Sequence, residues 1–157
     1  MIVMKNICKE YASGAKALSN VNIYIEKGDF VFLVGPSGAG KSTFIKMLFR
    51  EVLPTSGELT VAGYDVQKLV QTEVPFLRRS LGIIFQDYRL LPERTVYENV
   101  AFAMQVIEAP RREIKKRTNM VLELVGLRHR MRSYPGELSG GEQQRIAIAR
   151  AIVNDPK

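Results

Sequence analysis

Residues 35–42 read Gly-Pro-Ser-Gly-Ala-Gly-Lys-Ser, and this stretch decides the fold. The continuous apolar run at residues 30–34 precedes it and is typical of a strand buried on both faces. Residues 41–50 follow it and are predicted to form a helix with Phe44, Leu48 and Met47 on its buried side. A glycine-rich turn between a strand and a helix is the setting in which backbone N–H groups bind phosphate.

Each residue type in this loop has a physical reason. Gly38 and Gly40 allow the backbone to curl without Cβ clashes, which turns N–H groups toward an anion at the helix N-terminus. Lys41 can reach the β- and γ-phosphates of ATP, and Ser42 can hold Mg²⁺. A plain turn that starts a helix leaves the Lys-Ser pair unexplained. The predicted cofactor-binding residues of the loop are Gly35, Pro36, Ser37, Gly38, Ala39, Gly40, Lys41, Ser42 and Thr43.

A second motif, Leu-Ser-Gly-Gly-Glu-Gln, occupies residues 138–143. Ser139 and Glu142 match a capping box, which explains these two residues completely. It does not explain Gly140 and Gly141, because glycine is costly at a helix start unless the backbone must be approached closely. We predict that Ser139 both caps the helix and contacts phosphate. Two phosphate-binding helix starts in one chain indicate two surfaces that close on one nucleotide.

With both motifs in this order, the chain resembles the ATP-binding domain of ABC transporters over its whole length. Within that family it is most similar to the bacterial cell-division ATP-binding subunits. The narrower resemblance rests on residues 29–38 and on residues 85–103, which read Phe-Gln-Asp-Tyr-Arg-Leu-Leu-Pro-Glu-Arg-Thr-Val-Tyr-Glu-Asn-Val-Ala-Phe-Ala. The resemblance implies an α/β P-loop NTPase fold with an antiparallel β part, a parallel core sheet and a helical subdomain.

The resemblance also implies roles for single residues. Tyr11 matches the aromatic residue that stacks on adenine, although its sequence context fits a half-buried strand residue equally well. Gln86 matches the glutamine that contacts Mg²⁺ and the attacking water. The apolar run at 81–85 supports its placement, because it reads as another buried strand and ligands bind at the carboxyl edge of such sheets.

By the same resemblance, Lys41 and Gln86 are the catalytic residues, and Ser42 and Gln86 are the metal-binding residues. The signature residues match the group that contacts the γ-phosphate of ATP held by the other subunit; they are Ser139, Gly140, Gly141 and Glu142. The implied cofactors are ATP and Mg²⁺. The implied partners are a second copy of the chain, which pairs on ATP binding, and a permease-like membrane subunit.

The family resemblance implies an ATP-hydrolysing subunit of an ABC-type membrane complex acting in cell division. Two alternatives remain open, an ATPase subunit of a lipoprotein or peptide exporter and a nucleotide-binding module that does not hydrolyse. The lone Cys8 indicates a reducing compartment, and no apolar stretch approaches the ~20 residues of a membrane span. We therefore expect a cytoplasmic protein that is peripheral on the inner face of the plasma membrane.

The chain is basic, with a net charge of +7, and residues 111–117 form its densest cationic patch. An apolar helical stripe runs through the same region, so its charges are predicted to be the solvated face of a helix; the stripe comprises Ile114, Val121, Leu122 and Val125. Contact of this patch with an anionic membrane surface is the alternative. No nucleic-acid partner is expected.

The expected organisation is a partial ABC ATPase domain over residues 1–157. It comprises an antiparallel β part and P-loop core at 1–86, a helical subdomain at 87–137, and the signature motif with its helix at 138–157. Family members carry the acidic Mg²⁺-side residue and the water-polarising carboxylate on a strand after the position of Lys157. Residues 151–155 are predicted to continue a helix instead. We therefore expect a truncated domain that binds ATP and does not hydrolyse it alone.

Overall fold

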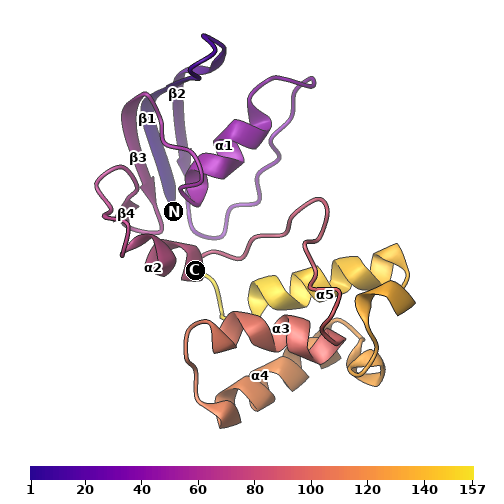
Figure 1. Cartoon of the computed structure of the whole chain (residues 1–157). Coiled ribbons are helices and arrows are strands. Elements are labelled where there is room, and N and C mark those ends of the chain that lie inside the picture. The colour runs from indigo at the N-terminus through magenta and orange to yellow at the C-terminus, as the bar shows by residue number, and fades with distance from the viewer. The chain divides into compact units, whose positions relative to one another are not determined.

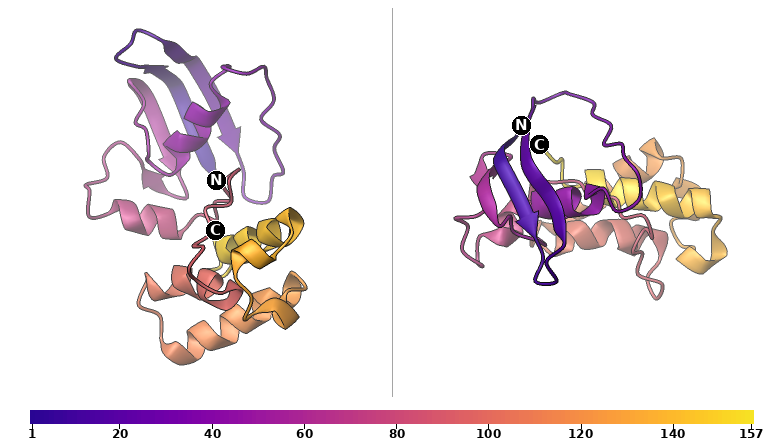
Figure 2. Two further views of the ribbon diagram at one scale, coloured as in Figure 1. Left: turned by 45° about the vertical axis from the view of Figure 1, so that its right-hand side comes forward. Right: turned by 90° about the horizontal axis from the view of Figure 1, so that it is seen from above.

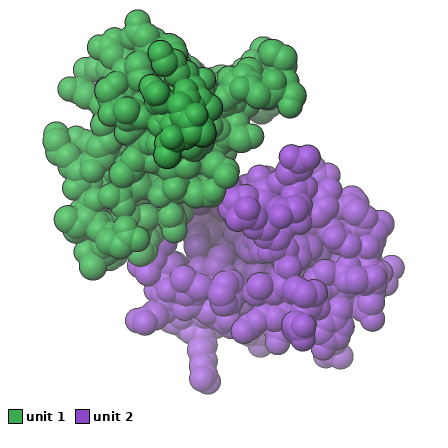
Figure 3. All heavy atoms as spheres, turned by 45° about the horizontal axis from the view of Figure 1, so that its top comes forward, with its two compact units in different colours: residues 1–78, 157 green, residues 79–156 purple.

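The computed structural model describes all 157 residues, which form two compact units (Figure 3). Unit 1 contains residues 1–78 together with Lys157, and unit 2 contains residues 79–156. Strands are confined to unit 1, whereas unit 2 is built from helices, turns and extended connections.

An antiparallel sheet forms the centre of unit 1 (Figure 1). Its strand order is β2-β1-β3-β4, and the strands are β1 (Ile2–Glu10), β2 (Lys16–Ile25), β3 (Ser56–Val61) and β4 (Tyr64–Asp65). The predicted antiparallel β part is thereby confirmed. Leu59 and Val61, two residues apart on β3, face the core by the alternation of the strand. Met4 and Ile7 of β1 are both buried although they are three residues apart.

A bulge interrupts β1 at Asn6. The backbone of Asn6 has a φ of 51°, and its N–H donates to Oδ1 of Asn22 at 2.8 Å. Pairing of β1 with both neighbours shifts at this point. On the β3 side, Gly57 has a φ of +97°, and a Cβ added there would lie 2.5 Å from the Asn6 carbonyl oxygen. Glycine is therefore required opposite the bulge.

Helix α1 (Lys41–Leu48) packs beside the sheet and closes the core of unit 1 (Figure 2). Phe44 and Met47 are buried on its inner face, as the apolar spacing predicts, while Leu48 is half-buried. The short helix α2 (Val74–Arg79) adds Val74 and Leu77 to the buried set.

Two predicted strands do not form. Residues 30–34 are extended without strand pairing and lie at the surface, where Phe30 is 84% exposed and Val34 is 83% exposed. Residues 81–85 also lack strand pairing, and in unit 2 Gly82 lies so close to helix α5 (Gly140–Ile152) that a Cβ would be 2.7 Å from the Ala151 carbonyl oxygen. All three strand pairs are antiparallel. The expectation of two buried parallel strands was wrong for these segments, because parallel pairing depends on distant strands and not on local apolar content.

Unit 2 packs three helices around one core: α3 (Val96–Gln105), α4 (Arg111–Leu124) and α5. Two 3-10 turns, η1 (Arg128–Arg130) and η2 (Pro135–Glu137), connect α4 to α5. Each helix contributes apolar side chains to this core, whose buried members are Val96, Val100, Met104, Val121, Leu122, Leu127, Leu138, Ile146, Ala149 and Val153.

The basic segment of α4 follows the predicted amphipathic pattern. Val121 and Leu122 are buried, while Arg111, Lys115 and Lys116 are exposed. The helix begins after Pro110 and is followed by a left-handed glycine at position 126, both of which are typical of helix ends. No helix in the structure has both the length and the apolar character that a membrane crossing demands.

We predict that Gly57→Ala destabilises unit 1 by about 1–3 kcal/mol, because the new Cβ collides with backbone oxygens and takes a strained left-handed conformation. The measurement is the urea midpoint of unfolding. Gly63→Ala is the matched control, since Gly63 has a similar φ of +91° but nothing within 4 Å of a Cβ. Equal losses in the two variants would show that the bulge contact is unimportant.

Candidate functional site

The loop before α1 has the backbone conformation of an anion-binding turn. Gly38 and Gly40 have φ values of +81° and +85°, in the left-handed region that glycine adopts without steric cost. Gly40 is the N-cap of α1, no side chain caps this helix, and its first turn holds no acidic residue. The first-turn N–H groups and the positive end of the helix dipole are therefore not neutralised by a neighbouring carboxylate.

Gly40 also allows the loop to pack closely against strand β2. A Cβ at this position would lie 2.3 Å from the carbonyl oxygen of Ala17 and 2.9 Å from Cδ2 of Leu18. Any side chain would push the start of α1 away from the strand, so the position of the loop depends on glycine here.

Lys41 folds over the loop that precedes it. Its Nζ donates to the carbonyl oxygens of Gly35 at 2.6 Å and Pro36 at 2.7 Å. These bonds hold the ammonium at the mouth of the loop, where it can turn to an incoming anion. The neighbouring hydroxyl residues differ in exposure, because Ser42 is exposed and Thr43 is buried.

Tyr11 lies directly beside this helix start. Its hydroxyl shares a hydrogen bond with Oγ1 of Thr43 at 3.0 Å, and the residue is 37% exposed. The ammonium of Lys9 lies 5.2 Å from the centroid of the ring. The hydrogen bond gives Tyr11 a structural role, and its partial exposure leaves ring surface open to a planar ligand.

The donor set around the loop suits a magnesium ion held together with phosphate. Mg²⁺ prefers hard oxygen ligands and is commonly bound by few protein groups plus substrate phosphates and water. The exposed hydroxyl of Ser42 in the first turn of α1 is such a ligand. The structure contains no group of three or more His, Cys, Asp or Glu residues that could hold a metal ion by themselves.

The predicted capping box at the start of α5 is confirmed. Oγ of Ser139 accepts from the Glu142 N–H at 3.3 Å and donates to the Glu142 carboxylate at 2.8 Å. The same carboxylate accepts from the Ser139 N–H at 2.9 Å. Gly140 and Gly141 are exposed, and an added Cβ on either would meet nothing within 4 Å. Their bare surface is open to close approach by a ligand.

The Glu142 carboxylate is stabilised in its charged form. Hydrogen bonds from the backbone and hydroxyl of Ser139 lower its pKa below the ordinary value of 4.5, and Arg130 and Arg145 act in the same direction. Nε of Arg130 lies 3.7 Å from Oε1 of Glu142. The helix start therefore carries a negative charge of its own, partly balanced by arginine.

Gln86 begins an unusual turn in unit 2. It is exposed and follows residues 81–85 directly. Tyr88 and Arg89, two and three residues further on, both have positive φ, at 56° and 45°. The guanidinium of Arg150 on α5 donates to the carbonyl oxygens of both residues, at 2.6 Å for Arg89. Sequence reasoning missed this contact, because the two partners lie more than 60 positions apart.

The loop that follows the turn is fixed by Asn99, which is fully buried on α3. Its Oδ1 accepts from the Leu91 N–H at 2.8 Å, and its Nδ2 donates to the carbonyls of Leu91, Arg94 and Thr95. Thr95 then caps α3 in a capping box with Glu98. The Thr-Val-Tyr-Glu spacing at 95–98 carries the signal that would have found this cap.

The predicted site residues are divided between the two units. Tyr11 and the loop residues from 35 to 43 lie in unit 1, while Gln86 and the signature residues 139–142 lie in unit 2.

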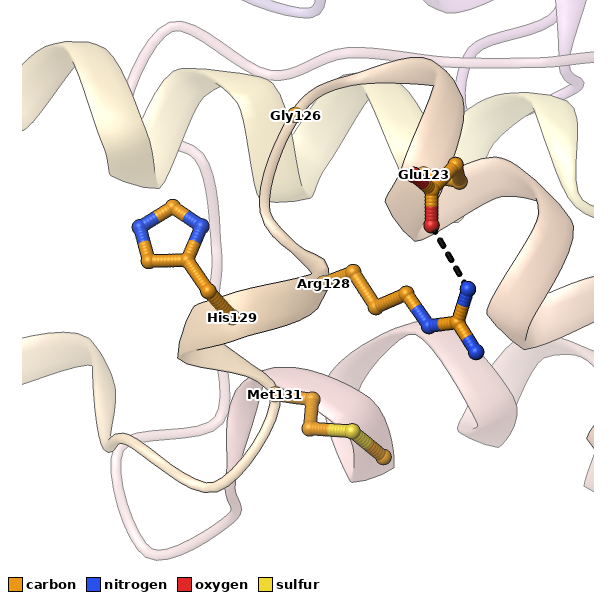
Figure 4. Close-up of a pocket in the computed structure, with 5 residues that line it drawn as sticks. All are labelled: Glu123, Gly126, Arg128, His129 and Met131. Atoms are coloured by element: carbon orange, nitrogen blue, oxygen red, sulfur yellow. Dashed lines mark hydrogen bonds and ion pairs between the residues drawn. The ribbon is translucent and has the colours of Figure 1, made fainter.

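A separate open hollow lies at the end of α4 and contains none of the predicted site residues (Figure 4). Glu123, Gly126, Arg128, His129 and Met131 line it. Arg128 and Glu123 form an ion pair of 2.9 Å beside it, and His129 is exposed.

Comparison with known proteins is consistent across sequence and structure. The family model described as ABC transporter matches residues 18–157. The chain is 58% identical over 157 residues to the cell division ATP-binding protein FtsE of Streptococcus pneumoniae serotype 2, which covers 100% of this chain and 68% of that protein. It is 53% identical to FtsE of Bacillus subtilis over 156 residues, covering 99% of this chain and 68% of that protein.

A solved structure shows the same likeness. The dimeric post-hydrolysis state of the ATP-binding cassette MJ0796, bound to ADP and Pi, superposes with a TM-score of 0.86 at 37% identity. The superposition covers 99% of this chain and 71% of that chain.

We predict that the thermal stability of unit 2 falls as the pH is lowered below about 4.5, the ordinary value for glutamate. The native pKa values of Glu142 and Glu98 are both lowered by capping hydrogen bonds, so the unfolded chain binds more protons. The stabilisation is complete above the unfolded pKa and is lost as the pH falls through the native one. Melting curves from pH 7 to pH 3 measure it.

The variants Glu142→Gln and Glu98→Gln should flatten this pH dependence. Glu113→Gln is the control, because its helix α4 has no side-chain cap. An unchanged pH profile in the first two variants would contradict the prediction.

Proposed function

Because the chain belongs to the ABC transporter family, we propose that it forms the ATP-binding part of an ABC-type membrane complex acting in bacterial cell division. The likeness to the cell division ATP-binding protein FtsE supports the cell-division role. In this proposal, a permease-like membrane subunit is the partner, and the ATP-binding part is peripheral on the inner face of the plasma membrane.

The geometry of the loop before α1 carries the proposal. Gly38 and Gly40 have left-handed backbones, the start of α1 has no carboxylate, and Lys41 lies over the loop on two carbonyl oxygens. A phosphate group entering here meets backbone N–H groups, a helix N-terminus and an ammonium. No neutral ligand would use all three.

The remaining site residues act on the same nucleotide in this proposal. Tyr11 offers its open ring surface to adenine, and Ser42 provides a hydroxyl ligand for Mg²⁺, which would neutralise phosphate charge when bound. Gln86 orients the attacking water and approaches Mg²⁺. Hydrolysis itself then depends mainly on positioning and on stabilisation of charge on the phosphoryl oxygens.

We further propose that the 157 residues alone bind nucleotide without turning it over. The phosphate loop is intact in the structure. In contrast, Asp155 follows α5 after a turn at Val153 and Asn154 and does not lie at the end of a strand. The water-polarising carboxylate of the proposed mechanism has no counterpart among these residues.

The central test is Lys41→Ala in the complete protein. Removing one donor to a developing phosphoryl charge costs about 10²–10³ in turnover in comparable sites, so we expect a loss of at least about 10²-fold. Phosphate release under saturating Mg-ATP measures the effect, and a circular dichroism melt checks folding. Turnover equal to wild type would refute the assignment of the loop.

A second test concerns pairing of two copies, each covering the other's ATP with its signature motif. In a mixture of Lys41→Ala and Ser139→Ala proteins, a mixed dimer has one intact composite site and one doubly damaged site. We expect the mixture to recover part of the activity that each variant lacks, measured as phosphate release after equilibration.

Thr95→Ala is the matched control for this mixture. It removes a comparable capping box from the same unit, at a cost of about 1 kcal/mol, and leaves the signature intact. We expect it to keep nucleotide-dependent pairing. If Thr95→Ala and Ser139→Ala behave alike, the serine acts only as a helix cap and the shared-site proposal is wrong.

A further inference from the structure

One arginine in unit 2 connects the two segments that the proposed function assigns to ATP. Arg150 lies near the C-terminal end of α5, the helix that begins at the signature residues Gly140 and Gly141. Its guanidinium donates to the carbonyl oxygens of Tyr88 and Arg89, in the turn that begins at Gln86. Arg150 is half-buried, so these bonds form with limited competition from water.

The turn is a conformation that needs outside support. Tyr88 and Arg89 are both non-glycine residues with left-handed backbones, which is uncommon for consecutive positions. The Tyr88 N–H donates to the Phe85 carbonyl at 3.0 Å, and the Arg89 N–H to the Asp87 carbonyl at 2.6 Å. Strained backbone of this kind persists only where the surroundings impose it.

The side chain of Arg89 has its partners within its own segment, whereas Arg150 joins the turn to α5. The Arg89 guanidinium lies 4.1 Å from the centroid of the Phe85 ring, and its Nε is 3.5 Å from Oδ1 of Asp87. Both partners of Arg89 belong to the same short segment. Arg150 instead belongs to a different element, α5. The two N–H donors of its planar guanidinium bond to the carbonyl oxygens of two neighbouring residues.

We propose that Arg150 is a positioning residue for ATP hydrolysis, which sets the place of Gln86 by holding the backbone of the turn that follows it. The inference rests on the proposed function for its kinetic consequence. Because α5 is a rigid helix, a displacement of its signature end is carried to Arg150 and from there to the turn at Gln86. The same guanidinium therefore makes the glutamine respond to engagement of the signature motif.

The proposal first predicts a local structural effect that does not depend on catalysis. In the complete protein, Arg150→Met keeps the apolar stem and removes both donors, so amide hydrogen exchange in peptides spanning residues 85–91 should accelerate by about tenfold or more. Arg150→Lys retains one possible donor and should give an intermediate rate. Unchanged exchange in this segment would overturn the proposal.

Arg117→Met is the matched control. Arg117 lies on α4, is half-buried, and donates through Nε to the carbonyl of Val153 at 2.7 Å, so it is also a guanidinium bonded to backbone near the end of α5. Its hydrogen bond goes to Val153 and its ion pair goes to Asp155, and neither partner belongs to the turn at Gln86. We expect Arg117→Met to lower the melting temperature without accelerating exchange at 85–91 and without lowering kcat.

The kinetic prediction separates positioning from general stability. A misplacement of about 1 Å in a catalytic group can cost about 10²-fold, so Arg150→Met should lower kcat by about 10–10²-fold while KM for ATP changes less than about threefold. In a Gln86→Ala background the same change should lower kcat no further, because the positioned side chain is already gone. Multiplicative losses in the double variant would overturn the proposal.

The outcomes distinguish this inference from the proposed function. If wild type hydrolyses ATP and Gln86→Ala impairs it while Arg150→Met does not, the function stands and the role of Arg150 is refuted. If the wild-type complete protein lacks ATPase activity, the proposed function fails. Hydrogen exchange at 85–91 then still decides whether Arg150 holds the turn.

Discussion

The close approach of Gly40 to the carbonyl of Ala17 is the contact on which the proposed phosphate site depends. It brings the start of α1 against β2 at a distance that no side chain permits. From this point the loop curls back through Gly38, and Lys41 reaches the carbonyls of Gly35 and Pro36. The hydrogen bond between Tyr11 and Thr43 fixes the same helix start to the end of β1. Contacts with β2 and with the end of β1 thus fix the position of the start of α1.

Local signals in the sequence predicted local structure well. The glycine-rich loop, the cap at Ser139 and the apolar stripe of α4 each depend on residues within a few positions of one another, and each is present in the structure. Propensity, capping and helical periodicity act over this range. The antiparallel strands β1 and β2 were also predictable, because they are adjacent in sequence and residues 21–25 of β2 alternate in polarity.

Features that depend on distant partners were not predictable in the same way. The apolar run at 30–34 reads as a buried strand, yet its residues form no strand pair and Phe30 and Phe32 contact each other edge to face at the surface. The Arg150 contact joins residues about 60 positions apart, and nothing in either segment marks the other. Tyr88 and Arg89 have positive φ although neither is a glycine or an asparagine, the residue types that would indicate this conformation in the sequence. The cap at Thr95 is different, because the spacing of Thr95 and Glu98 is a local signal of a capping box.

The two helix starts assigned to phosphate are not equivalent, and the difference explains why both would be used. The start of α1 has a lysine and no carboxylate, so it can capture an anion from solution. The start of α5 already accommodates the Glu142 carboxylate, which uses the Ser139 N–H and hydroxyl and remains ionised because those bonds lower its pKa. An isolated phosphate would be repelled by that charge. In the proposed function, such a surface would therefore approach a nucleotide whose charge is already neutralised at the loop before α1, and would not capture a free anion by itself.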